Sequence, residues 1–164
     1  MRLAAKVAVV TGAADGIGAA IARAFAAEGA RLVLGDIAEG KGRAVAGETG
    51  AAFLRCDVAE EADCKALVAE AVARHGRLDV LVNNAAVAIG GMPLHEMTEG
   101  QWARLMAVNL TSVYRLCREA LPVMIRQGSG CIVNMGSAQG HVGLDGWTAY
   151  AGAKGAIMAM TRQM

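Results

Sequence analysis

The sequence is poor in aromatic residues and in net charge, and these two shortages exclude several classes of partner. Aromatic side chains make up 4% of the 164 residues, which leaves few platforms on which the bases of single-stranded nucleic acid could stack. Sixteen basic and fifteen acidic residues leave a formal net charge of +1. We therefore expect neither nucleic acid nor an acidic membrane as a partner.

Long apolar stretches and a secretory signal are also lacking. No stretch approaches the length of a membrane span without a charge, and no extended hydrophobic region follows the basic residues near Met1. The cysteines form no C-x-x-C pair and lie in apolar or helical contexts: Cys56, Cys64, Cys117 and Cys131. We expect reduced, packed thiols in a cytoplasmic protein. The three histidines show no metal-ligand spacing, so no metal site is expected.

Apolar residues make up 55% of the chain and occur in short runs that alternate with helical patterns. The runs predict five strands, at 7–11, 31–36, 52–57, 79–83 and 131–135. The helical patterns cover about 17–28, 39–49, 60–75 and 98–127, and a last one begins near 148. Apolar strands separated by helices predict a parallel sheet covered on both faces. This is a doubly wound α/β domain that binds ligands at the carboxyl ends of its strands.

The last predicted helix reaches Met164 with neither a glycine cap nor a following strand. The fifth strand would then form an edge of the sheet. On these grounds we expect the chain to be a truncated version of a longer enzyme, ending after the fifth strand and the helix that follows it. A partner chain would shield the open edge.

Glycines crowd the turn between the first strand and the first helix, which reads T-G-A-A-D-G-I-G from Thr11. The missing side chains allow the backbone to turn tightly and to approach a pyrophosphate. The start of the helix offers free N–H groups and the positive end of its dipole. The position between strand and helix favours phosphate binding over a plain structural turn. The candidate residues are Gly12, Asp15, Gly16, Ile17 and Gly18.

An acidic residue, Asp36, closes the second predicted strand. A carboxylate at that place can accept hydrogen bonds from both hydroxyls of an adenosine ribose, and it repels a 2′-phosphate. Asp15 adds a second negative charge in the loop, and Ile37, rather than a basic residue, follows Asp36. The sequence therefore predicts NAD rather than NADP as cofactor. The alternative for Asp36 is a solvated acid at the end of a strand.

Tyr150 and Lys154 are four residues apart and lie on one face of the last predicted helix. A free tyrosine is a poor base at neutral pH, but a lysine one turn away favours the phenolate. Ser137 follows the fifth predicted strand, where its hydroxyl could hold a carbonyl oxygen. By spacing alone such a pair is more often a surface pair, so the catalytic interpretation depends on the other motifs.

Several motifs occur together and in order: T-G-x-x-x-G-I-G, Asn83-Asn84-Ala85, Asn109, Ser137 and Tyr150-x-x-x-Lys154. With these motifs the chain resembles the short-chain dehydrogenase/reductase family from Lys6 to Met164. The resemblance implies a single NAD(P)-binding Rossmann-fold domain over residues 1–164, without the C-terminal substrate-binding part. It implies an NAD-dependent oxidoreductase that transfers a hydride between nicotinamide and an alcohol or carbonyl substrate. The alternative is a catalytically incompetent dinucleotide-binding fragment of such an enzyme.

The resemblance also implies roles for individual residues. Tyr150 would be the general acid/base, and Lys154 would assist it and bind the nicotinamide ribose. Ser137 would orient the substrate oxygen, and Asn109 would position a water in a proton relay. The family usually shows N-N-A-G at the fourth strand; the residue in the last position here is Ala86, a change that we expect binding to tolerate. The remaining cofactor contacts would be Asp57 and Val58, beside the adenine, together with Asn83 and Ala85.

The substrate and the assembly are predicted only in outline. Gln139, His141 and Trp147 lie near the predicted catalytic residues. They either contact a hydroxylated substrate such as a sugar or face solvent. We expect a small alcohol, ketone or sugar-like substrate. Enzymes that the chain resembles pair long helices across subunits, so we expect a homodimer or homotetramer. The candidate subunit contacts are Leu116, Leu121 and Met124.

Overall fold

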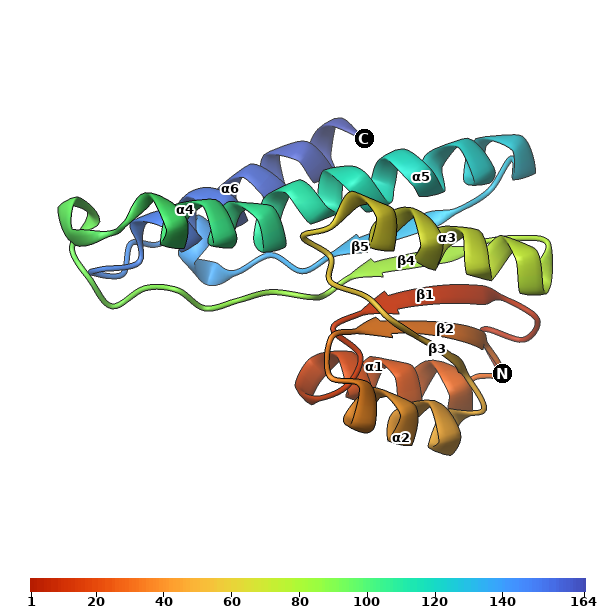
Figure 1. Cartoon of the computed structure of the whole chain (residues 1–164). Coiled ribbons are helices and arrows are strands. Elements are labelled where there is room, and N and C mark those ends of the chain that lie inside the picture. Colours follow the sequence, from red (N-terminus) through yellow and green to blue (C-terminus); the bar gives the residue numbers. More distant parts are fainter.

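The computed structural model describes residues 1–164 and contains a sheet of five parallel strands with helices on both faces (Figure 1). The strands are β1 (Val7–Thr11), β2 (Arg31–Asp36), β3 (Ala52–Arg55), β4 (Val80–Asn83) and β5 (Cys131–Asn134). Their spatial order is β3-β2-β1-β4-β5, and every neighbouring pair is parallel. The predicted doubly wound α/β fold is therefore confirmed. The third, fourth and fifth strands are one or two residues shorter than predicted.

The helices divide into two layers, one on each face of the sheet (Figure 1). One layer holds α1 (Gly16–Ala27) and α2 (Glu39–Thr49). The other holds α3 (Glu61–His75), α4 (Glu99–Met106), α5 (Ser112–Gln127) and α6 (Thr148–Gln163). Short helical turns are η1 (Leu94–Glu96), η2 (Ala107–Thr111) and η3 (Ala138–Gly140). None of the helices combines the length and the apolar character that crossing a membrane would require.

The core forms because successive side chains of β1 point to opposite faces of the sheet. Val7 and Val9 pack in the cluster below α3 and α5, whereas Ala8 and Val10 pack in the cluster below α1 and α2. All five residues of β1 are buried. Covering both faces explains why this strand reads as a continuous apolar run rather than an alternating one.

The long helical region predicted for 98–127 is confirmed, but it contains a change of helical type. Its start is fixed by a capping box: the Thr98 hydroxyl accepts from the Gln101 N–H at 3.2 Å, and Gln101 Oε1 accepts from the Thr98 N–H at 2.9 Å. Between α4 and α5, η2 is a π-helix. A π-turn shifts the register of the side chains that follow and often lies at a functional site. Periodicity alone did not predict it.

Three of the four cysteines, Cys56, Cys64 and Cys117, are buried as predicted. The prediction of a buried thiol was wrong for Cys131. Burial raises the pKa of the Cys56 thiol to about 12 and that of Cys64 to about 11, so both are poor nucleophiles. Cys131 is exposed. It lies on β5, which forms the edge of the sheet and alternates exposed with half-buried residues.

The structure also corrects two of the predicted subunit contacts. Leu116 and Met124 are 1% and 5% exposed and pack inside the chain's own core, against the sheet. The apolar residues that α5 presents to solvent are Tyr114 and Ile125, which are 52% and 74% exposed. The apolar stripe of α5 is needed to cover its own sheet, so it cannot at the same time serve a partner.

A buried carboxylate, paired with a half-exposed arginine, fixes the amino-terminal side of the sheet. Asp79, immediately before β4, is 5% exposed. Its carboxylate accepts from Arg77 Nε at 2.7 Å, from Arg77 Nη2 at 2.6 Å and from the Val7 N–H at 2.9 Å. Burial by itself would raise the pKa of Asp79, but the hydrogen bonds from Arg77 and Val7 outweigh it and hold the pKa below its ordinary value. The same carboxylate therefore joins the start of β1 to β4.

We expect Asp79→Asn to lower the free energy of unfolding by about 2 kcal/mol, because the variant loses the charge that Arg77 pairs with. The loss should shrink as the pH falls below 3.8, since the lowered pKa means that the wild-type chain loses this contribution on protonation. Urea unfolding at pH 7 and at pH 3 measures both effects. Asp145→Asn, at an exposed acid, is the matched control. Equal stability of the Asp79 and Asp145 variants would contradict this account.

Candidate functional site

The carboxyl end of β1 continues into a tight loop in which Gly12 and Gly18 have no room for a side chain. Gly12 and Gly16 have φ angles of +63° and +53°, in the left-handed region. A Cβ on Gly12 would lie 2.8 Å from the Cα of Ala85. A Cβ on Gly18 would lie 2.0 Å from the carbonyl oxygen of Gly12. The backbone of this loop is thus exposed on one side and in close contact with α1 and the β4 end on the other.

Asp15 caps the helix that follows the loop. Its Oδ1 accepts from the Gly16 N–H at 2.7 Å, and its Oδ2 lies 2.6 Å from Lys41 Nζ on α2. The hydrogen bond from Lys41, followed by that from the Gly16 N–H, holds the pKa of Asp15 below its ordinary value. Its charge is therefore partly balanced by Lys41. Ile17, the next apolar residue, is 61% exposed at the mouth of the loop.

Side chains from neighbouring strands hold the loop in place. Asn84 Nδ2 donates to the carbonyls of Thr11 and Gly12, at 3.0 and 3.1 Å. The Thr11 hydroxyl accepts from the N–H groups of Asn84 and Ala85, each at 3.1 Å. Asn84 was not among the predicted site residues, although the Asn83-Asn84-Ala85 motif contains it.

Asp36 holds the loop from the other side. Its Oδ2 accepts from the Ala14 N–H and its Oδ1 from the Ala38 N–H, each at 2.9 Å. The carboxylate is half-buried at the end of β2, so both oxygens are fixed in direction while lone pairs remain for further donors.

A pocket of about 150 Å³ opens where the carboxyl ends of β1, β2, β3 and β4 meet. It brings together five of the predicted cofactor residues: Gly12, Asp36, Asp57, Val58 and Ala85. Its other lining residues are Ile37, Cys56, Ala86, Val87, Arg104 and Val108. A larger hollow of about 380 Å³, near the end of α5 and β5, contains none of the predicted site residues. Chemistry, rather than size, therefore singles out the pocket at the strand ends.

Asn83, also predicted to line the cleft, does not line this pocket. It is buried, and its Nδ2 donates to Asn134 Oδ1 on β5 at 2.7 Å. Its own Oδ1 is buried without a hydrogen-bond partner. The structure thus uses Asn83 to join β4 to β5, and its contact with a cofactor stays a prediction.

The other half of the site lies on α6. Lys154 is 3% exposed, and its Nζ donates to the Met135 carbonyl at 2.6 Å. Burial lowers the pKa of this lysine. The Nζ atom lies 5.8 Å from the centre of the Tyr150 ring. No carboxylate pairs with Lys154, so the fold holds a buried cation beside a phenol with a single carbonyl for support.

Ser137 and Asn109 lie on segments that pack against α6. Ser137 caps η3, with its hydroxyl accepting from the Gln139 N–H at 3.2 Å. Asn109, in the π-helix, is 1% exposed. Its Oδ1 accepts from the Val87 N–H at 2.8 Å and its Nδ2 donates to the Val87 carbonyl at 2.9 Å. The four predicted catalytic residues thus come from segments that meet, but no hydrogen bond joins their side chains to one another.

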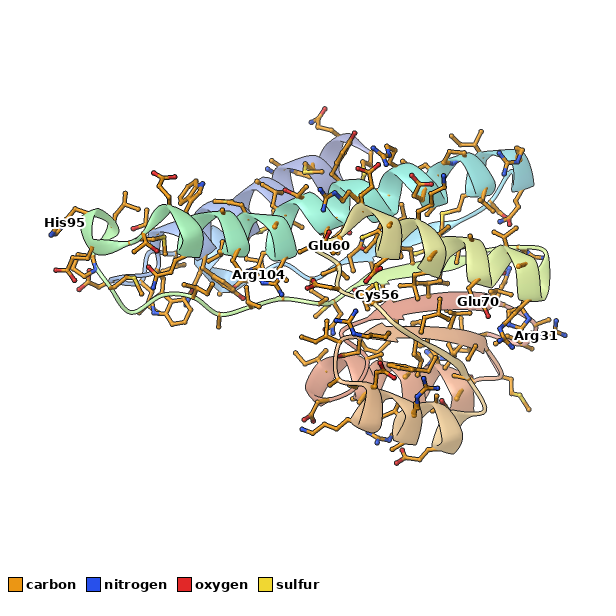
Figure 2. The ribbon with its side chains drawn as sticks, viewed as in Figure 1. Arg31, Cys56, Glu60, Glu70, His95 and Arg104 are labelled. Atoms are coloured by element: carbon orange, nitrogen blue, oxygen red, sulfur yellow. The ribbon has the colours of Figure 1, made fainter.

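Arg104 was missed by the sequence reasoning. It lies on α4, on the side of the helix near the chain segment that follows β4 (Figure 2), and it lines the pocket at the strand ends. Its guanidinium pairs with Asp57, 47 residues away in the chain. No local pattern marks such a residue, because its partner is decided by how α4 folds back over the sheet.

Comparisons with known proteins identify a matching family and several relatives. A sequence model of the family described as short chain dehydrogenase matches residues 6–164. An L-fucose dehydrogenase of Oryctolagus cuniculus is 46% identical over 99% of this chain. A cis-4-hydroxycyclohexanecarboxylate dehydrogenase of Sinomonas cyclohexanicum is 45% identical over 96% of it. The chain spans 57% and 65% of the lengths of these two relatives.

A solved structure shows the same fold. The crystal structure of a metagenomic short-chain oxidoreductase in complex with NADP matches with a TM-score of 0.93 and 41% sequence identity. The match covers 99% of this chain and 76% of that one.

We expect Gly18→Ala to lower the free energy of unfolding by about 2 kcal/mol, because the added methyl group would force the Gly12 carbonyl out of its place. Gly47→Ala, in the middle of α2 with no atom near the added group, should instead raise it by about 0.5 to 1 kcal/mol. Thermal and urea unfolding of both variants checks this. A Gly18 variant as stable as the wild-type chain would show that the loop is not as tight as described.

Proposed function

This chain belongs to the short-chain dehydrogenase family, and on that premise we propose that it carries the dinucleotide-binding and proton-transfer residues of an NAD-dependent oxidoreductase. The reaction moves a hydride between nicotinamide and the carbon of a secondary alcohol or ketone. The observation that carries this proposal is Lys154, a buried cation with no acid partner, one helical turn from Tyr150. Burying a charge without a partner lowers the free energy of unfolding, and groups perturbed in this way are concentrated at functional sites.

The residues present fit a dinucleotide. The glycine loop leaves no room for a Cβ at Gly12 or Gly18, and its exposed backbone lies at the start of α1, where N–H groups suit a pyrophosphate. The pocket beside it is apolar at Val58, Val87 and Val108 and acidic at its rim, as a purine base and its ribose require. When bound, the nicotinamide ring of such a cofactor accepts or donates the hydride.

The residues of the chain then move and hold the proton. In the oxidation direction the phenolate oxygen of Tyr150 takes the proton as the O–H bond of the alcohol breaks, and in reduction the phenol returns it. Lys154 stabilises the phenolate by its charge and binds the nicotinamide ribose. Ser137 orients the substrate oxygen, and Asn109 positions a water that connects the site to solvent. Tight fixing of Asn109 by Val87 supports a positioning role.

We propose NAD as the preferred cofactor because of Asp36. Two backbone N–H groups fix its carboxylate at the end of β2, where a 2′-phosphate would bring a second negative charge against it. Lys41, whose charge acts on Asp36, is itself paired with Asp15 at 2.6 Å. The metagenomic oxidoreductase was solved with NADP, so the proposed preference for NAD rests on this chain's own charges.

We propose that the substrate carries its hydroxyl group on a six-membered ring. L-fucose closes into such a ring, and cis-4-hydroxycyclohexanecarboxylate contains one, so the substrates in the names of both relatives share this feature. In this chain the Trp147 ring stands edge-on to Tyr150, with 5.6 Å between centroids, and lies against Gly90. A flat side chain beside the proton-transfer group suits a ring substrate. Gln139 and His141 lie in the same segment and could bind its further hydroxyl groups.

Tyr150→Phe should abolish turnover of cyclic secondary alcohols while leaving the Kd for NADH nearly unchanged, because only the proton-transferring oxygen is lost. Stopped-flow absorbance at 340 nm and calorimetric titration measure the two quantities. Tyr114→Phe, at an exposed tyrosine on α5, is the control and should leave both unchanged. Unchanged turnover in the Tyr150 variant would contradict the assignment. A wild-type chain that binds NADH without turnover would instead support the alternative, a non-catalytic dinucleotide-binding fragment.

Lys154→Met should remove activity without a matching loss of stability. Turnover is expected to fall at least about a hundredfold. The free energy of unfolding should stay within about 1 kcal/mol of wild type, since the lost carbonyl hydrogen bond is offset by removal of a buried charge. Because burial lowers the pKa of Lys154, the wild-type chain should also gain stability relative to the variant as the pH rises toward the ordinary value of 10.5.

Lys65→Met, at an exposed lysine on α3, is the control for that experiment and should change neither turnover nor the pH dependence. A large loss of stability in the Lys154 variant would make this lysine a structural residue. Urea unfolding between pH 7 and pH 10, combined with turnover at pH 7, separates the two interpretations.

We propose a homodimer or homotetramer as the assembly. Trp102 on α4 and Tyr114 and Ile125 on α5 are exposed apolar residues on the long helices, in place of the two buried ones predicted from sequence. Size-exclusion chromatography with light scattering should show twice or four times the 16.8 kDa chain mass. A monomer at micromolar concentration would contradict the proposal.

A further inference from the structure

Two contacts hold the segment that follows β5 against α6 (Figure 1). At the start of this segment the Met135 carbonyl accepts from Lys154 Nζ at 2.6 Å. At the end of η3, Gly140 lies against the backbone of α6 at Lys154 and Gly155. Ser137 lies between these two contacts in the chain. Its place relative to α6 is therefore set from both sides.

Gly140 has no room for a side chain. It ends η3 with a φ angle outside the left-handed region, so a contact, rather than the conformation of the backbone, excludes a Cβ here. A Cβ on Gly140 would lie 2.6 Å from Met158 Sδ, 3.2 Å from the Gly155 nitrogen and 3.3 Å from the backbone carbonyl carbon of Lys154. The sulfur belongs to a flexible side chain, but the two backbone atoms are fixed by the helix. The close approach of η3 to α6 therefore depends on glycine at this position.

The short turn η3 connects Gly140 to Ser137. The Gly140 N–H donates to the Ser137 carbonyl at 3.0 Å. The Ser137 hydroxyl accepts from the Gln139 N–H at 3.2 Å, so its own proton remains available for a substrate oxygen. Because the turn contains only three residues, a displacement of Gly140 from α6 also displaces the Ser137 hydroxyl.

We infer that Gly140 is a positioning residue for the proton-transfer step: its missing side chain lets η3 pack on α6, and this sets the place of the Ser137 hydroxyl relative to Tyr150. The inference rests on the roles proposed for Ser137 and Tyr150. It adds to them a residue that acts through Ser137 rather than on the substrate itself. The substrate oxygen must meet both hydroxyl groups in one complex, so a displacement of a fraction of an ångström lowers the rate.

The test is a graded series at this position, Gly140→Ala and Gly140→Val, with cyclohexanol and NAD. Absorbance at 340 nm gives kcat and KM, and calorimetric titration gives the Kd for NADH. We expect kcat to fall about fivefold in the alanine variant and at least about fiftyfold in the valine variant, because the larger side chain forces η3 further from α6. KM and the Kd for NADH should stay within about twofold of wild type, since only an interaction of the transition state is weakened.

Gly143→Ala is the matched control. Gly143 follows in the same segment, its φ also lies outside the left-handed region, and no atom lies within 4 Å of an added Cβ. This variant should keep the wild-type kcat, KM and Kd. Circular dichroism establishes that the variants are folded. Should Gly140→Val fail to fold, the comparison of Gly140→Ala with Gly143→Ala decides the question by itself.

The outcomes separate the inference from the proposed function. A folded Gly140→Ala variant with the wild-type kcat overturns the inference and leaves the proposed function intact. A similar loss of kcat and of affinity for NADH also overturns it, because the residue would then support the site as a whole. A wild-type chain that fails to bind NADH, or that binds it without oxidising cyclohexanol, overturns the proposed function, and the inference falls with it.

Discussion

The backbone of the glycine-rich loop stays open to a ligand only because side chains of two neighbouring strands hold it. Asn84 and Thr11 join the loop to the end of β4, and Asp36 joins it to the end of β2. The glycines of this loop lose more conformational freedom on folding than other residues would, so contacts from neighbouring strands are needed to fix the loop. The parallel sheet provides these contacts because it brings the carboxyl ends of β1, β2, β3 and β4 to one edge, and the pocket lies at that edge.

Two buried charged residues, Asp79 and Lys154, differ in the partners that the structure gives them. Asp79, at the amino-terminal side of the sheet, is paired with Arg77 and the Val7 N–H, and its pKa is held low. Lys154, beyond the carboxyl end of β5, has one carbonyl as its partner, and burial lowers its pKa. The first arrangement joins strands. The second leaves a buried charge beside Tyr150 without an acidic partner, as the proton-transfer role that we propose for this pair requires.

Features set by local sequence patterns could be predicted, whereas contacts between distant segments could not. The apolar runs, the helical patterns and the glycine turn are local, and they predicted the sheet, the long helix and the loop. Contacts between distant segments left no mark in the sequence. Periodicity could not show that Leu116 covers its own sheet, that Cys131 lies on an exposed edge strand, or that Asn83 turns toward Asn134. Arg104 reaches Asp57 only once α4 has packed over the strand ends, so spacing gave no indication of it.

The central claim is that this edge of the sheet binds a dinucleotide and that Asp36 selects the one without a 2′-phosphate. Calorimetric titration of the wild-type chain with NAD and, separately, with NADP tests it most directly. The account predicts binding of NAD at least about tenfold tighter than NADP, as a fixed carboxylate against a phosphate requires. Equal or tighter binding of NADP would contradict the role of Asp36. Binding of neither would contradict the dinucleotide site itself.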